Sequence, residues 1–88
     1  MSWDYSFSDQ AIKQLKKLGP EVSRRIYAYL DTNIVGIDDP RKLGKALRGE
    51  QGKLWRYRTG HYRIICHLVD AQVEVLIVRV GHRKNVYD

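Results

Sequence analysis

The 88-residue sequence predicts an α+β fold, in which an N-terminal strand and a helical hairpin pack on an antiparallel sheet, with the helices on one of its faces. Two observations predict this class: apolar residues recur at helical spacing up to about residue 34, and they alternate with polar residues from residue 54 onward. The composition, 43% hydrophobic and 30% charged, is too apolar for a disordered chain. We expect one domain spanning residues 1–88, because a second core needs a longer chain.

The first third of the chain has the pattern of a strand followed by two helices. Residues 3–7 alternate bulky and polar side chains, which indicates a short strand, and Ser8 is of a type that caps helices. The first helix should end at Gly19, because glycine commonly follows the last turn of a helix. Pro20 suits the first turn of a second helix, which the apolar stripe carries to Ile34.

The rest of the chain changes from helical to strand periodicity. Residues 36–40 contain Gly, Asp and Pro and mark a break, after which we expect residues 41–47 to be short helical or irregular structure. Three segments rich in Val, Ile and aromatic residues then predict an antiparallel meander of strands over 54–59, 62–69 and 72–80.

The turn between the last two strands sets their register. If Asp70-Ala71 is a two-residue turn, His67 lies opposite Glu74 as an ordinary cross-strand pair, and Arg63 lies opposite Val78 on the same face. The other face is almost wholly apolar and should lie under the helices. Its residues are Ile64, Cys66, Leu68, Val73, Val75 and Ile77.

Three arginines are expected on the face away from the helices. A two-residue turn, at Thr59-Gly60 or at Gly60-His61, places Arg56 and Arg58 on the same face as Arg63, whereas a three-residue turn would separate them. Adjacent like charges repel, and a fold tolerates them mainly when an anionic group lies between them. The alternative is that these arginines only solvate the open face.

Charge distribution indicates a polyanionic partner. Residues 1–40 hold five basic and six acidic residues, whereas residues 41–88 hold eleven and four, so the net charge of +6 arises in the second half. Nucleic acid is the commonest partner for so basic a domain, although a basic face can also serve solubility alone. The sequence shows no secretion signal, membrane span or metal-ligand spacing, and its single cysteine, Cys66, favours the cytoplasm.

Three segments, residues 47–49, 54–65 and 79–87, together resemble the RelE toxins of bacterial toxin–antitoxin systems, and the resemblance covers nearly the whole chain. It implies a RelE-like fold and an endoribonuclease that enters the A site of the 70S ribosome and cuts the bound mRNA. It also implies cleavage without a metal or other cofactor, through attack of the ribose 2′-OH on the adjacent phosphate. The implied partners are the ribosome, mRNA and a cognate antitoxin, through which the monomeric toxin forms larger assemblies.

The resemblance implies specific site residues. Arg63 and Arg83 match arginines assigned to phosphate stabilisation and leaving-group protonation, Arg56 matches a basic residue beside the scissile phosphate, and Tyr87 matches a proposed general base or stacking partner. The expected substrate contacts are Arg48, Lys53, Arg58, His82 and Lys84.

This sequence departs from the family pattern at Leu54, where the prototype has an active-site lysine, although Lys53 is adjacent. His82 stands where the prototype has a further lysine, and an imidazole there could share the proton transfers.

The main alternative is a ParE-like toxin, which has the same fold but inhibits DNA gyrase and cleaves no RNA. The presence of Arg56, Arg63, Arg83 and Tyr87 together favours a RelE-like nuclease. A non-catalytic RNA-binding module is a further alternative, but the sequence lacks the paired aromatic motifs of such modules.

Overall fold

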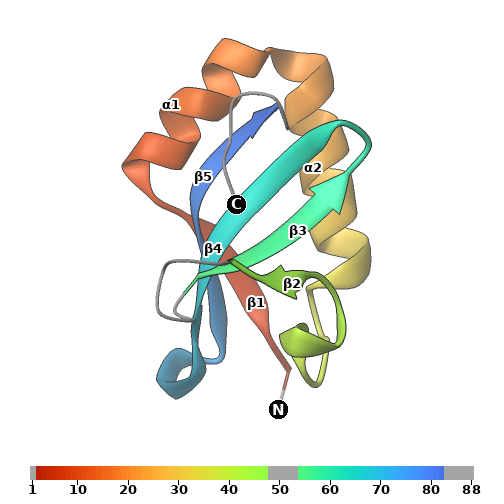
Figure 1. Cartoon of the computed structure of the whole chain (residues 1–88), viewed down its shortest axis with the longest axis vertical. Helices are drawn as coiled ribbons and strands as arrows, with labels where there is room; N and C mark the ends of the chain where they lie inside the picture. The colour runs from red at the N-terminus through yellow and green to blue at the C-terminus, as the bar shows by residue number, and fades with distance from the viewer. Residues whose placement is uncertain (1, 48–53, 83–88) are drawn as a thin grey trace.

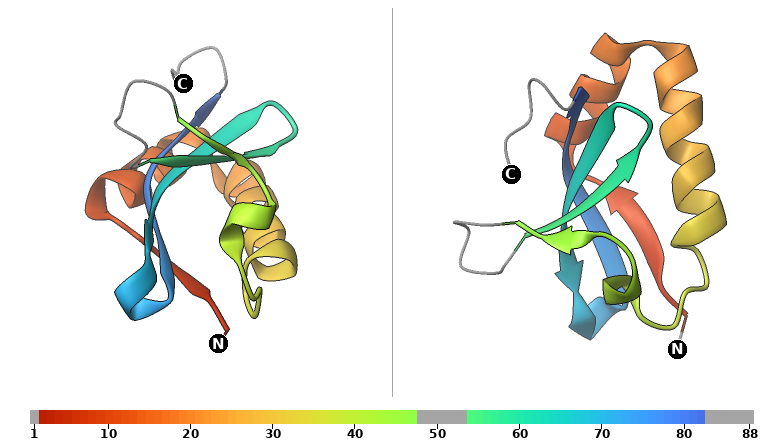
Figure 2. Two further views of the ribbon diagram at one scale, coloured as in Figure 1. Left: turned by 60° about the horizontal axis from the view of Figure 1, so that its bottom comes forward. Right: turned by 45° about the vertical axis from the view of Figure 1, so that its right-hand side comes forward.

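Two helices cover one face of a five-stranded sheet in this computed structural model, which describes residues 2–47 and 54–82 (Figure 1). Both helices lie on the same side of the sheet, as the rotated views show (Figure 2). The α+β class predicted from the sequence is therefore confirmed. The elements are β1 (Asp4–Phe7), α1 (Asp9–Leu18), α2 (Pro20–Asn33), the 3-10 turn η1 (Pro40–Lys42), β2 (Lys45–Ala46), β3 (Trp55–Thr59), β4 (Tyr62–Val69), the 3-10 turn η2 (Asp70–Gln72) and β5 (Glu74–His82).

The strands lie in the order β1-β5-β4-β3-β2. Strands β2 to β5 form an antiparallel meander, and β1 pairs in parallel with β5, with Asp4 opposite Glu74 and Phe7 opposite Ile77. The parallel pair needs a long crossover, which both helices and the meander supply. Neither described helix is long and apolar enough to cross a membrane.

Local sequence signals set the ends of the helices as expected. The Ser8 hydroxyl accepts a hydrogen bond from the Ala11 N–H at 3.1 Å, which satisfies one of the first amides of α1. Gly19, at φ +94°, ends α1, and Pro20 then opens α2.

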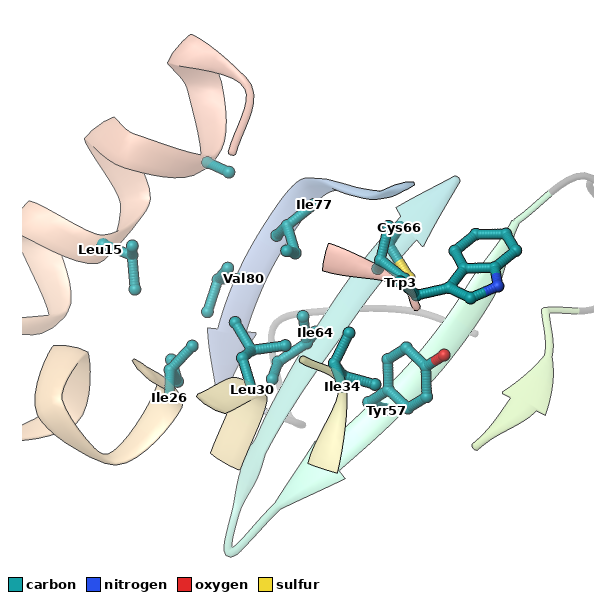
Figure 3. Packing of buried hydrophobic residues seen from close by; sticks show 12 residues of the cluster. Trp3, Leu15, Ile26, Leu30, Ile34, Tyr57, Ile64, Cys66, Ile77 and Val80 are labelled. Atoms are coloured by element: carbon teal, nitrogen blue, oxygen red, sulfur yellow. The ribbon is translucent and has the colours of Figure 1, made fainter. Parts of the chain in front are cut away.

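The main core lies between the helices and the sheet (Figure 3). Ile26 and Leu30 of α2 pack toward Ile64 of β4, and all three side chains are fully buried. Tyr57 of β3 is also fully buried and donates its hydroxyl hydrogen bond to the Pro40 carbonyl at 2.7 Å. This bond ties the sheet to the loop that precedes β2.

A second, smaller cluster lies on the other face of the sheet. It consists of Leu47, Leu54 and Ile65, with Val78 packed against it. Ile65 lies on this face and is completely buried there. The face away from the helices is therefore apolar in part and not a uniformly solvated surface.

The predicted register between β4 and β5 is wrong. His67 lies opposite Leu76 and not Glu74, because residues 70–73 form a four-residue connection in place of the expected two-residue turn. Val73 closes this connection in the left-handed region, at φ 53°.

A β-bulge moves the register again beyond this turn. The pairing shifts between Ile65 and Cys66, so that Arg63 lies opposite Gly81 and not Val78. The predicted apolar face toward the helices is confirmed, because Ile64, Cys66, Val75 and Ile77 all belong to the main core.

The segment 41–47 was expected to be helical or irregular, and it contains the end of η1 and the short strand β2. Gly44, at φ +73°, permits this arrangement. An added Cβ at Gly44 would overlap the Arg56 carbonyl oxygen and lie 2.8 Å from Trp55 Nε1. Only glycine therefore lets β2 approach β3 so closely.

Candidate functional site

The β3–β4 hairpin positions three arginines on one face. Its turn is Gly60-His61, since Thr59 lies opposite Tyr62, and Gly60 at φ +60° suits the first position of a type II′ turn. With this two-residue turn, the expected sharing of a face is confirmed. The three arginines are Arg56, Arg58 and Arg63, and they alternate with the buried Tyr57 and Ile64 on the helix side.

Cations face cations across these strands. Arg58 lies directly opposite Arg63, and Lys45 of β2 lies directly opposite Arg56. We call these four residues the cationic face. Directly opposed like charges destabilise a sheet, so this arrangement suits an anion that bridges them.

Lys45 is the candidate that the sequence analysis missed. The segment 41–47 shows no strand periodicity, and β2 has only two residues, so nothing placed Lys45 beside Arg56. The positive charge of Lys45 was the only feature of the sequence that could have indicated a role in this site.

The cationic face borders a hollow of about 330 Å³ at the β2 side of the sheet. Arg58 is exposed there, whereas Arg56 is half-buried. Guanidinium groups stay charged at any physiological pH and match phosphate oxygens with paired hydrogen bonds. The lining residues are Tyr29, Leu43, Gly44, Lys45, Arg56 and Arg58.

His82 lies apart from the cationic face. It pairs with Tyr62 at the end of β4, and residues at this register position point to the helix side, opposite to Arg63. Its ring stacks on His61 with centroids 5.9 Å apart and meets Tyr62 edge-on at 5.6 Å. The structure therefore does not bring His82 together with the arginines.

Five of the predicted site residues lie outside the described residues: Arg48, Lys53, Arg83, Lys84 and Tyr87. Their roles stay predictions.

Other reactive groups offer little to this site. Burial raises the pKa of the Cys66 thiol, which lies in the main core and is inert there, as expected. Within residues 2–47 and 54–82, no three His, Cys, Asp or Glu side chains are placed to hold a metal ion. The chemistry that the cationic face offers is the electrostatic stabilisation of a bound anion.

Comparison with known proteins identifies the family. Residues 5–87 match the family described as the ParE toxin of the type II toxin–antitoxin system parDE. The chain belongs to the RelE/ParE superfamily of toxins. The toxin RelG of Mycobacterium tuberculosis is 30% identical to this toxin, over 99% of this chain and 98% of RelG. The mRNA interferase toxin RelE of Escherichia coli is 28% identical over 97% of this chain and 87% of the relative.

Solved structures agree with this assignment. The toxin–antitoxin complex RelBE2 of M. tuberculosis contains a chain that superposes with a TM-score of 0.81 at 28% identity, covering 94% of this toxin and 100% of that chain. E. coli RelE in complex with an antitoxin peptide gives a TM-score of 0.70 at 27% identity, covering 93% of this toxin and 84% of that chain. The RelE-like fold expected from the sequence is therefore confirmed.

Proposed function

We propose that this toxin is an endoribonuclease that cleaves mRNA in the ribosomal A site. The observation that carries the proposal is the cationic face, in which Arg58 opposes Arg63 and Lys45 opposes Arg56. Such a face suits a phosphodiester, which carries its charge on oxygens that accept hydrogen bonds from several cations at once. The name of the E. coli relative, an mRNA interferase, supports the same activity.

The reaction is an internal transfer at phosphorus. The ribose 2′-oxygen attacks the adjacent phosphate while its proton passes to a base, and the bond from phosphorus to the 5′-oxygen breaks. The leaving 5′-oxygen takes up a proton, so the products are a 2′,3′-cyclic phosphate and a 5′-hydroxyl. The protein must therefore remove one proton, stabilise the charged phosphorane and supply one proton.

We assign phosphorane stabilisation to Arg63, on the family resemblance and on its position between Arg58 of β3 and Gly81 of β5. Arg56 and Lys45 extend the positive charge along β3 and β2. We assign the proton transfers to Arg83 and Tyr87 on the family resemblance, and no step in this scheme requires a metal.

Inhibition of DNA gyrase is the second candidate function. The observation that favours it is the family match itself, whose description is that of a ParE toxin. A gyrase inhibitor needs a docking surface and no phosphorane-stabilising cations, so the two functions predict different effects of Arg63→Ala.

Growth and synthesis assays separate the two candidates. Induction of the wild-type toxin in bacteria should stop protein synthesis within minutes, measured as incorporation of labelled methionine, and Arg63→Ala should restore it. Purified toxin should leave gyrase supercoiling of a relaxed plasmid unchanged. Inhibition of supercoiling by both the wild type and Arg63→Ala would instead establish the gyrase reading.

A protein antitoxin is the expected partner in the cell. Several solved structural neighbours are toxin–antitoxin complexes, including those of M. tuberculosis and E. coli. We infer that an acidic segment of a cognate antitoxin neutralises part of the cationic face, and that the toxin acts in the cytoplasm, where ribosomes are located.

A further inference from the structure

Acidic and basic residues concentrate at opposite ends of the molecule. Six of the eight acidic residues in the described part of the chain gather where β1 and β5 begin and where α2 ends. They are Asp4, Asp31, Asp38, Asp39, Asp70 and Glu74. The two ion pairs among the described residues, Arg41–Asp70 and Lys42–Asp38, also lie at this end. The opposite end holds the α1–α2 junction, the β3–β4 turn and the end of β5 (Figure 1).

This opposite end is rich in cations that form no described ion pair. Lys17 lies in the last turn of α1, and Arg24 and Arg25 lie in the first half of α2. All three are exposed. The Arg25 guanidinium lies against the Gly60 turn, since a Cβ added there would overlap it. Glu21 is the one acidic residue among these side chains.

Two hollows flank a cluster of rings at this end. One, of about 550 Å³, is lined by Arg24, Arg25, His61 and Tyr62, together with Glu21 and Val22. The other, of about 220 Å³, is lined by Lys17, Arg79 and His82, together with Gln14, Leu18, Val80 and Gly81. The ring contacts of His82 with His61 and Tyr62 join the two hollows into one surface.

We propose that this surface, which we call the basic end, is a second RNA-binding site that holds the phosphate backbone of structured RNA. It is defined by Lys17, Arg24, Arg25, His61, Tyr62 and His82. Arg79 also lines the smaller hollow, but it pairs with Ile65 and belongs to the sheet face of Arg63. The proposal rests on the proposed function, in which the toxin must dock on ribosomal RNA while the cationic face engages mRNA.

The chemistry of the basic end favours RNA over a protein partner. Protein interfaces need a buried apolar centre, whereas the larger hollow is lined mainly by charged and polar side chains. Interfaces with nucleic acid are more polar and more positive. Arginines and lysine suit phosphate oxygens, and the exposed ring of His61 beside the half-buried rings of Tyr62 and His82 suits bases or sugars.

The basic end is separate from the cationic face. Tyr62 and His82 occupy register positions on the helix side of β4 and β5, whereas Arg63 and its partner Gly81 occupy positions on the other side. The two sites meet around the end of the sheet that carries the β3–β4 turn, and Arg79 lines the smaller hollow from the sheet face of Arg63. One toxin could therefore hold two RNA segments at once.

Paired charge removal tests this site. The double variant R24Q/R25Q removes two positive charges from the basic end, and R41Q/K42Q removes two from the acidic end. The probe is a fluorescently labelled 20-base-pair RNA duplex, and the readout is the dissociation constant from anisotropy at several salt concentrations. Thermal melting confirms that both variants are folded.

R24Q/R25Q should bind the duplex at least about 10-fold more weakly than the wild type. Its plot of log affinity against log salt should be shallower by about 2, which corresponds to two lost phosphate contacts. R41Q/K42Q should stay within about 2-fold of the wild type. Equal affinities of the two double variants would overturn the proposal. The proposal would also be overturned if R24Q/R25Q lost its affinity for a polyglutamate peptide but kept its affinity for the duplex. That result would favour an acidic protein partner.

Cosedimentation with 70S ribosomes and mRNA cleavage distinguish this proposal from the proposed function. If the wild type cleaves ribosome-bound mRNA while R24Q/R25Q binds ribosomes as well as R41Q/K42Q does, only the second site is wrong. If the wild type neither cleaves nor cosediments, yet R24Q/R25Q still loses duplex affinity, the RNA site stands and the proposed function is wrong.

Discussion

At the scale of single residues, the opposition of Arg58 and Arg63 should lower the stability of the sheet. Directly opposite like charges cost roughly 0.2–1 kcal/mol, so Arg58→Gln should raise the melting temperature by up to about 6 °C in low salt. The gain should shrink in 1 M salt, where charges are screened. Differential scanning calorimetry at both salt concentrations measures it. Lys13→Gln, which changes an exposed residue of α1, is the control. An equal rise in melting temperature for Lys13→Gln would show that repulsion between Arg58 and Arg63 is not the cause.

Lys45 offers a second prediction at this scale. A charge-assisted hydrogen bond to the substrate phosphate contributes about 1.5 kcal/mol or more, so Lys45→Gln should lower the rate of mRNA cleavage by at least about 10-fold. Lys42→Gln, which removes a charge paired with Asp38 beside the same strand, should leave the rate within about 2-fold. Single-turnover cleavage rates decide the matter, and equal rates for the two variants would exclude Lys45 from the site.

At the scale of elements, Gly44 is required for β2 to pair with β3. Gly44→Ala should destabilise the toxin by about 2–3 kcal/mol, because it combines a positive φ with overlap of the Arg56 carbonyl oxygen. Gly36 also has a positive φ, +82°, but a Cβ there would meet nothing within 4 Å. Gly36→Ala should therefore cost only about 1 kcal/mol. Urea unfolding of both variants measures the difference, and equal losses would show that overlap at Gly44 is relieved without cost.

Turn geometry decided which parts of the sheet could be predicted from the sequence. Gly60 is a strong local signal, so a two-residue turn and the shared face of Arg56, Arg58 and Arg63 followed from it. No comparable signal exists at residues 70–73, where the valine at position 73 adopts a left-handed conformation that β-branched residues rarely take. The register of β5 was therefore wrong, although the apolar face toward the helices was predicted correctly.

The candidate site was predictable only where periodicity was strong. Positions on β3 and β4 followed from alternation, whereas Lys45 lies on a strand of two residues that has no pattern to read. His82 was grouped with the arginines on the family resemblance, because it stands where the prototype has a lysine. A bulge between Ile65 and Cys66 alters the pairing of β5, and the sequence contains no signal for it.

At the scale of the whole molecule, a buried thiol and a buried phenol should lower the stability of the fold at alkaline pH. Burial raises the pKa of the Cys66 thiol and of the Tyr57 hydroxyl above their ordinary values of 9.0 and 10.0. The folded protein thus keeps these protons while the unfolded chain loses them, so the free energy of unfolding should fall as the pH rises through 9 and 10. Urea unfolding at pH 8 and pH 10.5 measures the fall. Tyr57→Phe should lose less than the wild type over this interval, and an equal loss would contradict the role of Tyr57.

Cleavage of ribosome-bound mRNA is the function that we propose for this member of the RelE/ParE superfamily. Its most direct test is primer extension on a reporter mRNA translated in a purified bacterial system, with and without ribosomes, comparing the wild type with Arg63→Ala and Arg83→Ala. We predict cuts at A-site codons that need ribosomes and that both variants lose. Persistent cutting by both variants, or no cutting by a wild-type toxin that still arrests growth, would contradict the account.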